Sequence, residues 1–390
     1  MAVHVGIIDQ DPVRLVTPLL DNRTVSKHIV FIGEKSQESI FERLSSVLKQ
    51  REITSEFFEI PSEVNTSLIK QSIQTLAKDL FDRGEDVKLN ASCGLRHRLL
   101  SVYEVFRSYR WPIFVVEPNS DKLCWLYPDG KEETEVEDHI TISDYLTIFG
   151  ARAEFQTVDI SPQLDQTLYA LGERWASNAL ELGPGLATLN YLATTCRKEQ
   201  KLDVELSEKQ QGYRELNMLL TDLVDAKIAT YENGILTFAN EDARRFSNGE
   251  WLETLVNSTV KQIQDTMPTI QDRSLNVQVY RTRGESEVRN ELDVATVVNN
   301  KLHIIECKTK GMRDDGDDTL YKLESLRDLL GGLQARAMLV SFRPLRHNDI
   351  TRAEDLGLAL IGPDELKDLK THLTAWFKAA GGYKSDEDLD

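Results

Sequence analysis

The chain has 390 residues, of which 41% are apolar and 28% charged, and its formal net charge is −18. This length exceeds the size at which one hydrophobic core stops growing, so we expect two or three domains. No stretch reaches the roughly 20 apolar residues of a membrane span, which argues against a membrane role. The acidic charge would repel a polyanion over most of the surface, so binding of nucleic acid requires local positive patches or bridging metal ions.

The four cysteines lie far apart and form no Cys-x-x-Cys pair. This spacing argues against both a structural zinc site and a disulfide framework. Residues 1–9 read as a strand and lack the basic and apolar regions of an export signal. We therefore expect a cytoplasmic protein.

Residues 1–150 alternate short β-type runs with helical patterns, which is typical of a parallel sheet covered by helices on both faces. Strands are predicted at residues 3–8, 26–32, 57–60, 87–90 and 112–116, and helices at residues 38–50, 67–81 and 97–106. An antiparallel edge strand is predicted at residues 123–127. The pattern indicates a Rossmann-like α/β domain.

Residues 151–245 change in character, with an amphipathic helix predicted at residues 164–180 and further helices at residues 186–196 and 213–226. A hairpin at residues 231–238 follows, around an Asn-Gly turn. Helices followed by a small hairpin suggest a winged helix. In an acidic chain, we favour a connector or dimer contact over a DNA-binding role for this module.

Residues 246–380 are predicted to form a second α/β domain, with strands at residues 275–280, 291–298, 302–307 and 337–342 between helices. Residues 381–390 are acidic and are predicted to be a disordered tail.

Within this domain, two β-type runs flank Asn299-Asn300, a pair that tolerates the left-handed backbone of a two-residue hairpin turn. That turn would pair residue 298 with residue 301. Counting back along both strands then places Asp293 opposite Glu306, and Glu291 opposite Lys308.

Carboxylates about 5 Å apart are destabilising without a counterion. Oxygen ligands at this spacing suit Mg²⁺ or Mn²⁺, and Lys308 would neutralise developing charge or orient the attacking water. Asp293, Glu306 and Lys308 are therefore the candidate catalytic residues for phosphodiester hydrolysis, with Asp293 and Glu306 as metal ligands. A solvated hairpin face is the alternative, but the opposed second acid and the apolar neighbours favour catalysis.

Two flanking segments add candidates. Glu253, on a helix that begins near Trp251, is a possible third metal ligand or else a solvent-facing helix glutamate. Residues 273–313 carry eight Lys or Arg and five acids, so the local field is positive and suits a nucleic-acid substrate. The candidate substrate contacts, for which surface charge is the alternative explanation, are Glu291, Lys310, Tyr321 and Lys322.

The loop after the strand at residues 87–90 has anion-binding character. Asn90 and Gly94 allow close backbone approach at a helix start, and Arg96, His97 and Arg98 add donors. Ligands of open α/β sheets bind at the carboxyl ends of strands, where this loop lies. His97 and Arg98 could instead cap and solvate the helix, and Cys93 is better explained as a small buried residue than as a nucleophile.

The acid order Glu253, Asp293, Glu306-Cys307-Lys308 resembles the PD-(D/E)XK, restriction-endonuclease-like superfamily. The domain order, together with Gly249-Glu250-Trp251-Leu252-Glu253, Asn290-Glu291-Leu292-Asp293 and Ile305-Glu306-Cys307-Lys308-Thr309, is similar to the CARF nucleases. Those proteins join a CRISPR-associated Rossmann-fold sensor to such a nuclease through a winged helix.

The resemblance implies a homodimer in antiviral defence that binds a cyclic oligoadenylate, typically cyclic tetra-adenylate. Binding would activate Mn²⁺- or Mg²⁺-dependent cleavage of single-stranded nucleic acid, or nicking of duplex DNA. Family members often carry Asn-x-Thr-Gly-Gly-Thr-Lys in the second sensor loop, where only Asn90 and Gly94 match outright. Carried over to this chain, the ligand-binding residues are Asp9, Gln10, Asp11, Asn90, Ser92, Cys93, Gly94, Arg96 and His97.

The sequence thus predicts a ligand-gated, metal-dependent nuclease, and leaves open whether it cuts DNA or RNA. The alternatives are a nucleotide-sensing regulator that binds DNA through the winged helix without catalysis, and an inactive partner protein that kept the nuclease fold.

Overall fold

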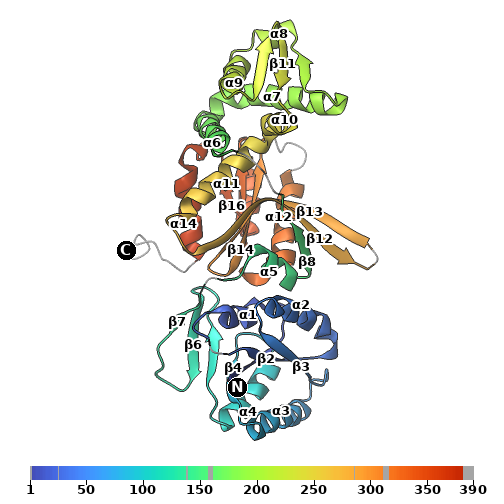
Figure 1. Ribbon diagram of the computed structural model, residues 1–390, viewed down its shortest axis with the longest axis vertical. Helices are drawn as coiled ribbons and strands as arrows, with labels where there is room; N and C mark the ends of the chain where they lie inside the picture. The colour runs from blue at the N-terminus through green and yellow to red at the C-terminus, as the bar shows by residue number, and fades with distance from the viewer. Residues whose placement is uncertain are drawn as a thin grey trace.

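Three sheets follow one another along the long axis of the molecule (Figure 1). The computed structural model describes residues 2–24, 26–137, 139–156, 161–284, 286–310 and 316–380. The tail predicted at residues 381–390 lies outside this part. None of the helices in the described part is both long and apolar enough to cross a bilayer.

The N-terminal domain holds a seven-stranded sheet of order β3-β2-β1-β4-β5-β6-β7, in which the first five strands are parallel. Its strands are β1 (Ala2–Ile7), β2 (His28–Gly33), β3 (Thr54–Glu59), β4 (Asp86–Asn90), β5 (Ile113–Val116), β6 (Lys122–Tyr127) and β7 (Thr134–Glu135). Its helices are α1 (Val13–Leu20), η1 (Lys35–Gln37), α2 (Glu38–Lys49), α3 (Thr66–Asp82) and α4 (Arg96–Ser108).

The predicted parallel sheet with helices on both faces is confirmed. β1 and β2 bury nearly every side chain, because α3 and α4 cover one face of the sheet while α1 and α2 cover the other. Two details differ from the prediction. β6 is antiparallel to β5 as expected but is not the edge, since the two-residue strand β7 lies outside it. α1 was not predicted, because Pro18 interrupts a short helical pattern.

The middle of the chain forms a three-stranded sheet of order β10-β11-β9 packed on helices. The predicted hairpin is confirmed, since β10 and β11 are antiparallel and both turn residues, Asn233 and Gly234, have positive φ angles. The elements are α6 (Pro162–Ser177), α7 (Ala179–Glu199), β9 (Asp203–Glu205), α8 (Glu208–Gln211), α9 (Arg214–Asp225), β10 (Ala229–Glu232), β11 (Ile235–Phe238) and α10 (Glu241–Arg245).

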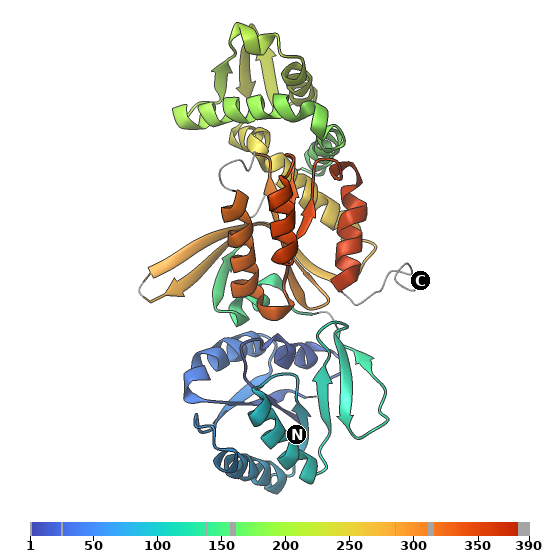
Figure 2. The same cartoon turned by 180° about the vertical axis from the view of Figure 1, so that it is seen from behind.

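The C-terminal domain contains a six-stranded sheet of order β16-β15-β14-β13-β12-β8. α11 and α14 pack on one face, and α12 and α13 pack on the other (Figure 2). The elements are η2 (Phe246–Glu250), α11 (Trp251–Gln264), β12 (Ile270–Arg283), β13 (Ser286–Val298), β14 (Lys301–Lys308), α12 (Gly316–Gly331), η3 (Gly332–Gln334), β15 (Arg336–Ser341), α13 (His347–Asp355), β16 (Ala359–Ile361), η4 (Leu366–Asp368) and α14 (Leu369–Ala380).

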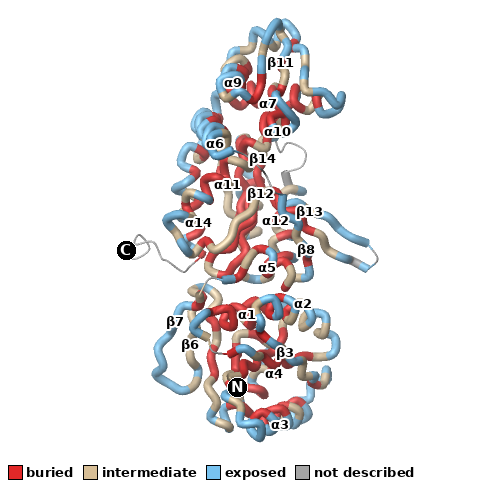
Figure 3. Tube along the Cα trace, in the orientation of Figure 1, coloured by how far each residue is buried: buried red, intermediate tan, exposed pale blue. Residues whose placement is uncertain are grey.

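The end strand of this sheet comes from the other end of the chain. β8 (Ala151–Glu154), which follows α5 (Ile142–Ile148), pairs antiparallel with β12. Its residues were expected to begin the connector, but they cover part of the long edge of β12, which would otherwise expose unpaired backbone groups. One cluster of buried apolar residues includes side chains of both the N-terminal sheet and the six-stranded sheet. Figure 3 shows buried segments on both sides of the boundary between them.

The turn between β13 and β14 also contacts the N-terminal domain. The side-chain amide of Asn300 donates to Asp121 Oδ2 at 2.6 Å, and Nζ of the buried Lys301 donates to the Asn119 carbonyl at 2.7 Å. The same two strands carry Asp293 near the middle of β13, and Glu306 and Lys308 at the far end of β14. One hairpin therefore joins the N-terminal domain to the candidate catalytic residues.

Candidate active site

The predicted turn and register of the β13–β14 hairpin are confirmed. Asn299 and Asn300 have φ angles of 47° and 55°, and the pairing runs from Val298–Lys301 back to Val294–Ile305. The ladder ends there, so the expected pairings of Asp293 with Glu306 and of Glu291 with Lys308 are not formed. Instead, Asp293 Oδ2 accepts a hydrogen bond from the Cys307 backbone N–H at 2.7 Å. The carboxylate of Asp293 is thereby held beside Glu306.

Glu306 and Lys308 form an ion pair on β14. Glu306 is only 6% exposed, and Lys308 is half-buried. Burial alone would lower the pKa of Lys308, but the negative charge of Glu306 and its hydrogen bond outweigh burial and raise that pKa. Lys308 therefore carries a fixed positive charge at neutral pH, which suits stabilisation of a phosphate anion.

Glu253 reaches the same site from the first turn of α11. Gly249, with φ 120°, lies just before that helix, and a Cβ atom there would collide with Thr309 Oγ1 at the end of β14. This glycine lets the start of α11 lie against β14. As a result, burial, and then the charges of Asp293, Glu250, Glu291 and Glu306, raise the pKa of Glu253 to about 9.

Asp293 experiences the same environment. Burial, and then the charge of Glu306, raise its pKa to about 7, although the Cys307 N–H and Lys308 act in the opposite direction. The site thus confines several carboxylates in a poorly solvated space. A cation bound between them would remove the repulsion and keep them ionised.

The donor set fits a metal that takes few protein ligands. The described residues contain no group of three or more His, Cys, Asp or Glu side chains arranged to enclose an ion. Mg²⁺ and Mn²⁺ sites of nucleic-acid enzymes need only one or two carboxylates and are completed by water and substrate phosphate. Asp293 and Glu306 match that requirement, with Glu253 nearby.

The four candidate substrate contacts differ in their surroundings. Glu291, Lys310 and Lys322 are exposed, and the charge of Glu291 raises the pKa values of Glu253 and Asp293. Tyr321 turns towards α13, where its hydroxyl is hydrogen-bonded to Arg352 and the guanidinium lies 5.2 Å from the ring centroid. Tyr321 is therefore held by a residue of the neighbouring helix α13.

Sequence reasoning missed two residues around this site. Glu250 is partly buried, and its Oε2 lies 3.4 Å from Nε of Arg245. Burial, with a contribution from the negative charge of Glu291, raises the pKa of Glu250. Asn190 of α7 is buried and its amide lies 3.5 Å from Thr309 Oγ1. Glu250 was within a quoted motif, whereas Asn190 had no local signal because the packing of α7 brings it there.

The two loops predicted to bind a ligand lie together, since β1 and β4 are neighbours in the sheet. Asp9 Oδ2 accepts from the Gly94 N–H at 3.1 Å, and the Cys93 thiol donates to the Asp11 carbonyl at 3.2 Å. Gly94 has φ 116°, and a Cβ atom there would lie 3.0 Å from Ile7. The glycine lets the second loop cross closely over β1.

Several polar groups of the second loop are already used within it. The buried Asn90 amide donates to the Arg14 carbonyl at 2.8 Å, and Ser92 Oγ accepts from the Val116 N–H at 2.7 Å. Burial raises the pKa of Cys93 to about 12, so its thiol stays protonated as a small buried group. These three residues shape the loop.

Other predicted residues of the two loops have more freedom. Gln10 and Arg96 are exposed and His97 is partly buried. Arg98, expected as a further donor, is buried and forms an ion pair with Glu34. Arg98 is therefore already paired within the protein, whereas Gln10, Arg96 and His97 can still contact a ligand.

The chain is similar to proteins of known structure and to one domain family. The family model of the Card1-like endonuclease domain matches residues 240–380. Protein VC1899 from Vibrio cholerae shares 82% identity over 98% of this chain and 99% of that one, with a TM-score of 0.95. No curated protein matches the chain.

Two more distant structures share the fold. Can2 from Sulfobacillus thermosulfidooxidans, solved in complex with cyclic tetra-adenylate, has 21% identity and a TM-score of 0.77, over 97% of this chain and 99% of that one. A Type III CRISPR defence DNA nuclease activated by cyclic oligoadenylate has 15% identity and a TM-score of 0.57, over 95% of this chain and 51% of that one.

Proposed function

We propose that this chain, whose residues 240–380 match the Card1-like endonuclease domain, belongs to the CARF nucleases and is a metal-dependent nuclease activated by a cyclic oligoadenylate. The observation that carries the proposal is the carboxylate cluster beside Lys308, which lies within the endonuclease domain. Residues 1–150 act as the sensor, the middle of the chain as a winged-helix connector, and residues 246–380 as the nuclease.

Asp293 and Glu306 would hold Mn²⁺ or Mg²⁺, with Glu253 as a third candidate ligand. The bound metal would polarise the scissile phosphate and lower the pKa of the attacking water. The Cys307 N–H orients Asp293, and Glu306 keeps Lys308 protonated. Lys308 then stabilises the negative charge that develops on the phosphate as the water oxygen attacks and the ester oxygen leaves.

The activating ligand is proposed from the sensor loops. Asp9, Gln10 and Asp11 lie beside the loop that carries Gly94, at the carboxyl ends of β1 and β4. The fold of Can2, a protein solved with cyclic tetra-adenylate, makes this ligand the first choice. A homodimer in the cytoplasm, acting in antiviral defence on single-stranded DNA or RNA or nicking duplex DNA, completes the proposal.

The β13–β14 hairpin supports control of one domain by the other. Its turn is hydrogen-bonded to Asn119 and Asp121 of the sensor domain, and its strands hold Asp293 and Glu306. A shift of the sensor loops would be passed to the carboxylates through strands that are buried on both faces.

The proposal is tested by cleavage of labelled single-stranded DNA, single-stranded RNA and supercoiled plasmid with Mn²⁺, with and without cyclic tetra-adenylate. We expect stimulated cutting by the wild type and none by Glu306→Ala/Lys308→Ala. The control Glu354→Ala/Lys367→Ala alters two exposed residues of the same domain and should cut normally. Duplex binding that survives EDTA, with no cutting of any substrate, would favour the non-catalytic regulator instead.

A further inference from the structure

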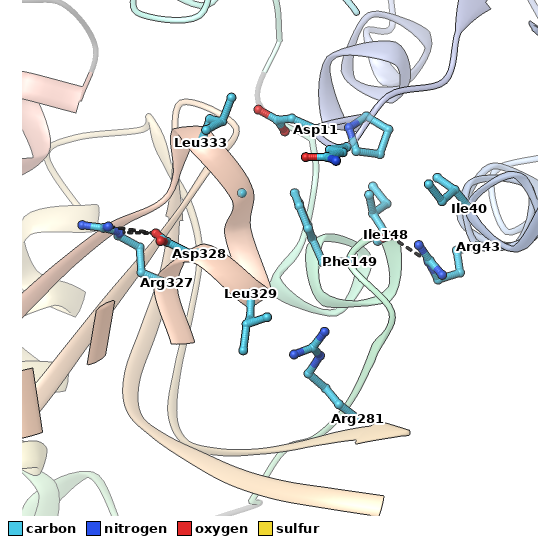
Figure 4. Close-up of a pocket in the computed structure, with 13 residues that line it drawn as sticks. Asp11, Ile40, Arg43, Ile148, Phe149, Arg281, Arg327, Asp328, Leu329 and Leu333 are labelled. Atoms are coloured by element: carbon cyan, nitrogen blue, oxygen red, sulfur yellow. Dashed lines mark hydrogen bonds and ion pairs between the residues drawn. The ribbon is translucent and has the colours of Figure 1, made fainter. Parts of the chain in front are cut away.

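A cavity of about 720 Å³ lies between the sensor and nuclease domains of the chain (Figure 4). The sensor side contributes the loop after β1, the middle of α2 and the end of α5. The nuclease side contributes β12 and the end of α12. This volume falls within the range of sites that bind small molecules.

Two arginines face this cavity from opposite domains. Arg43 comes from α2 and uses its Nε to donate to the Ile148 carbonyl at 3.0 Å. Arg281 comes from β12, and its buried Nε has no hydrogen-bond partner among the described residues. Within the described part of the chain, neither arginine forms an ion pair with a carboxylate. Two neighbouring guanidiniums without a counterion are a site for an anion with several oxygens.

A carboxylate and an aromatic ring complete the cavity. Asp11 is only 6% exposed, and neither of its carboxylate oxygens has a hydrogen-bond partner in the described chain. Its oxygens can therefore accept from hydroxyl or amino groups of a ligand. The ring of Phe149 is stacked on Tyr145 at 5.4 Å, and Ile40 and Leu333 add apolar surface. Leu333 is 86% exposed and lies at the rim of the cavity.

We propose that this cavity binds a nucleotide, with its phosphate between Arg43 and Arg281, a sugar hydroxyl or base amino group on Asp11, and its base against Phe149. An inorganic anion would use only the arginines, and an apolar ligand would leave the Asp11 carboxylate and Nε of Arg281 without hydrogen-bond partners. A nucleotide uses all three features.

Because the cavity lies between two domains, a bound nucleotide would also affect how the domains are held together. Arg43 belongs to the sensor domain and Arg281 to the nuclease domain, so one phosphate would join the two. Asp11 lies in a loop that is also proposed to contact the activating ligand. Occupancy of this cavity would therefore bias the same interface that the sensor uses to control the nuclease.

Two sources offer this chemistry: a free nucleotide such as AMP or a linear 5′-phosphorylated diadenylate, and cyclic tetra-adenylate itself. Titration calorimetry with each of these and with inorganic phosphate separates them. The measurement uses the full-length Glu306→Ala/Lys308→Ala protein without metal, so it does not depend on cutting. The titration with cyclic tetra-adenylate rests on the proposed function, whereas the titrations with AMP and with the linear diadenylate do not.

We expect at least one nucleotide to bind, with Arg281→Gln weakening it about tenfold or more and Arg281→Lys restoring part of the loss. Arg289→Gln changes an exposed residue of β13, the strand paired with β12, and should bind nucleotide with the affinity of the wild type. If Arg281→Gln and the wild type bind the nucleotide with equal affinity, the cavity proposal is overturned. If that equally bound nucleotide is cyclic tetra-adenylate, the sensor loops alone hold it, and the proposed function survives. Binding of phosphate but of no nucleotide would also overturn it.

Discussion

Glu253→Gln separates the effect of the buried charge from the effect of the metal. Glu253 has an ordinary pKa of 4.5, which burial and the neighbouring acids raise to about 9. A carboxylate with a raised pKa in the folded state favours folding below its ordinary pKa, and this contribution is lost as the pH rises through the folded value. The metal-free protein should therefore become less stable between about pH 5 and about pH 9.

The size of the effect follows from the same two pKa values. A tenfold change in a protonation equilibrium corresponds to about 1.4 kcal/mol, so raising the pH from the ordinary pKa of 4.5 to about 7.5 costs about 4 kcal/mol. Solvent screening at a partly exposed glutamate and mutual adjustment of the neighbouring acids reduce this to about 2 kcal/mol. The uncharged glutamine should raise the melting temperature in EDTA by roughly 2 to 3 °C, because the unfolding entropy scales with a chain of 390 residues.

The assay is thermal unfolding in EDTA at several pH values, repeated with Mn²⁺. We expect Glu253→Gln to be more stable than wild type at neutral pH, equal to it near pH 4.5, and less stabilised by Mn²⁺. Glu354→Gln, an exposed glutamate on α13, is the matched control and should behave like wild type. If Glu253→Gln melts like wild type at every pH in EDTA, Glu253 does not share the electrostatic environment of the strand acids, and the reasoning fails.

Other variants test separate parts of the structure. Asp293→Asn should lower Mn²⁺-dependent cutting by roughly 100-fold or more with an unchanged circular dichroism spectrum, because one carboxylate ligand is lost; near-normal cutting would remove Asp293 from the site. Gly249→Ala should cost about 1 to 3 kcal/mol in urea unfolding and weaken cutting, because the new Cβ collides with Thr309; an unchanged unfolding midpoint would contradict the close approach of α11 and β14. Asn300→Ala should reduce stimulation by cyclic tetra-adenylate while leaving unstimulated cutting intact, because its amide contacts Asp121; full stimulation would show that the hairpin turn does not couple the domains.

Local patterns in the sequence were enough for much of the fold. The parallel strands of the N-terminal domain were predictable because burial on both faces demands continuous apolar runs, as in β1 and β2. The β13–β14 hairpin was predictable because Asn299-Asn300 adopts the left-handed backbone that a two-residue turn requires. That turn sets the register, and the register brings Asp293 to the same end of the hairpin as Glu306 and Lys308.

The edges of the sheets were not predictable in the same way. β7 has two exposed residues, and β8 has the sequence Ala-Arg-Ala-Glu with mixed exposure, so neither carries a strand signal of its own. β8 becomes a strand because β12 offers it unpaired backbone groups. Pairing with a distant segment decided these elements.

The sequence by itself determined the turn and register of the β13–β14 hairpin that carries the candidate catalytic residues, because turn geometry and strand alternation act over a few neighbouring positions. Only the tertiary structure decided that Glu253 lies among the strand acids, since that depends on Gly249 packing against Thr309. It also decided that Asp11 and Arg281 line one cavity. The cavity joins residues from different domains, and the site around Glu253 joins segments of one domain that lie far apart in the sequence. The free energy that brings them together comes from burying shared surface, which a local sequence pattern does not show.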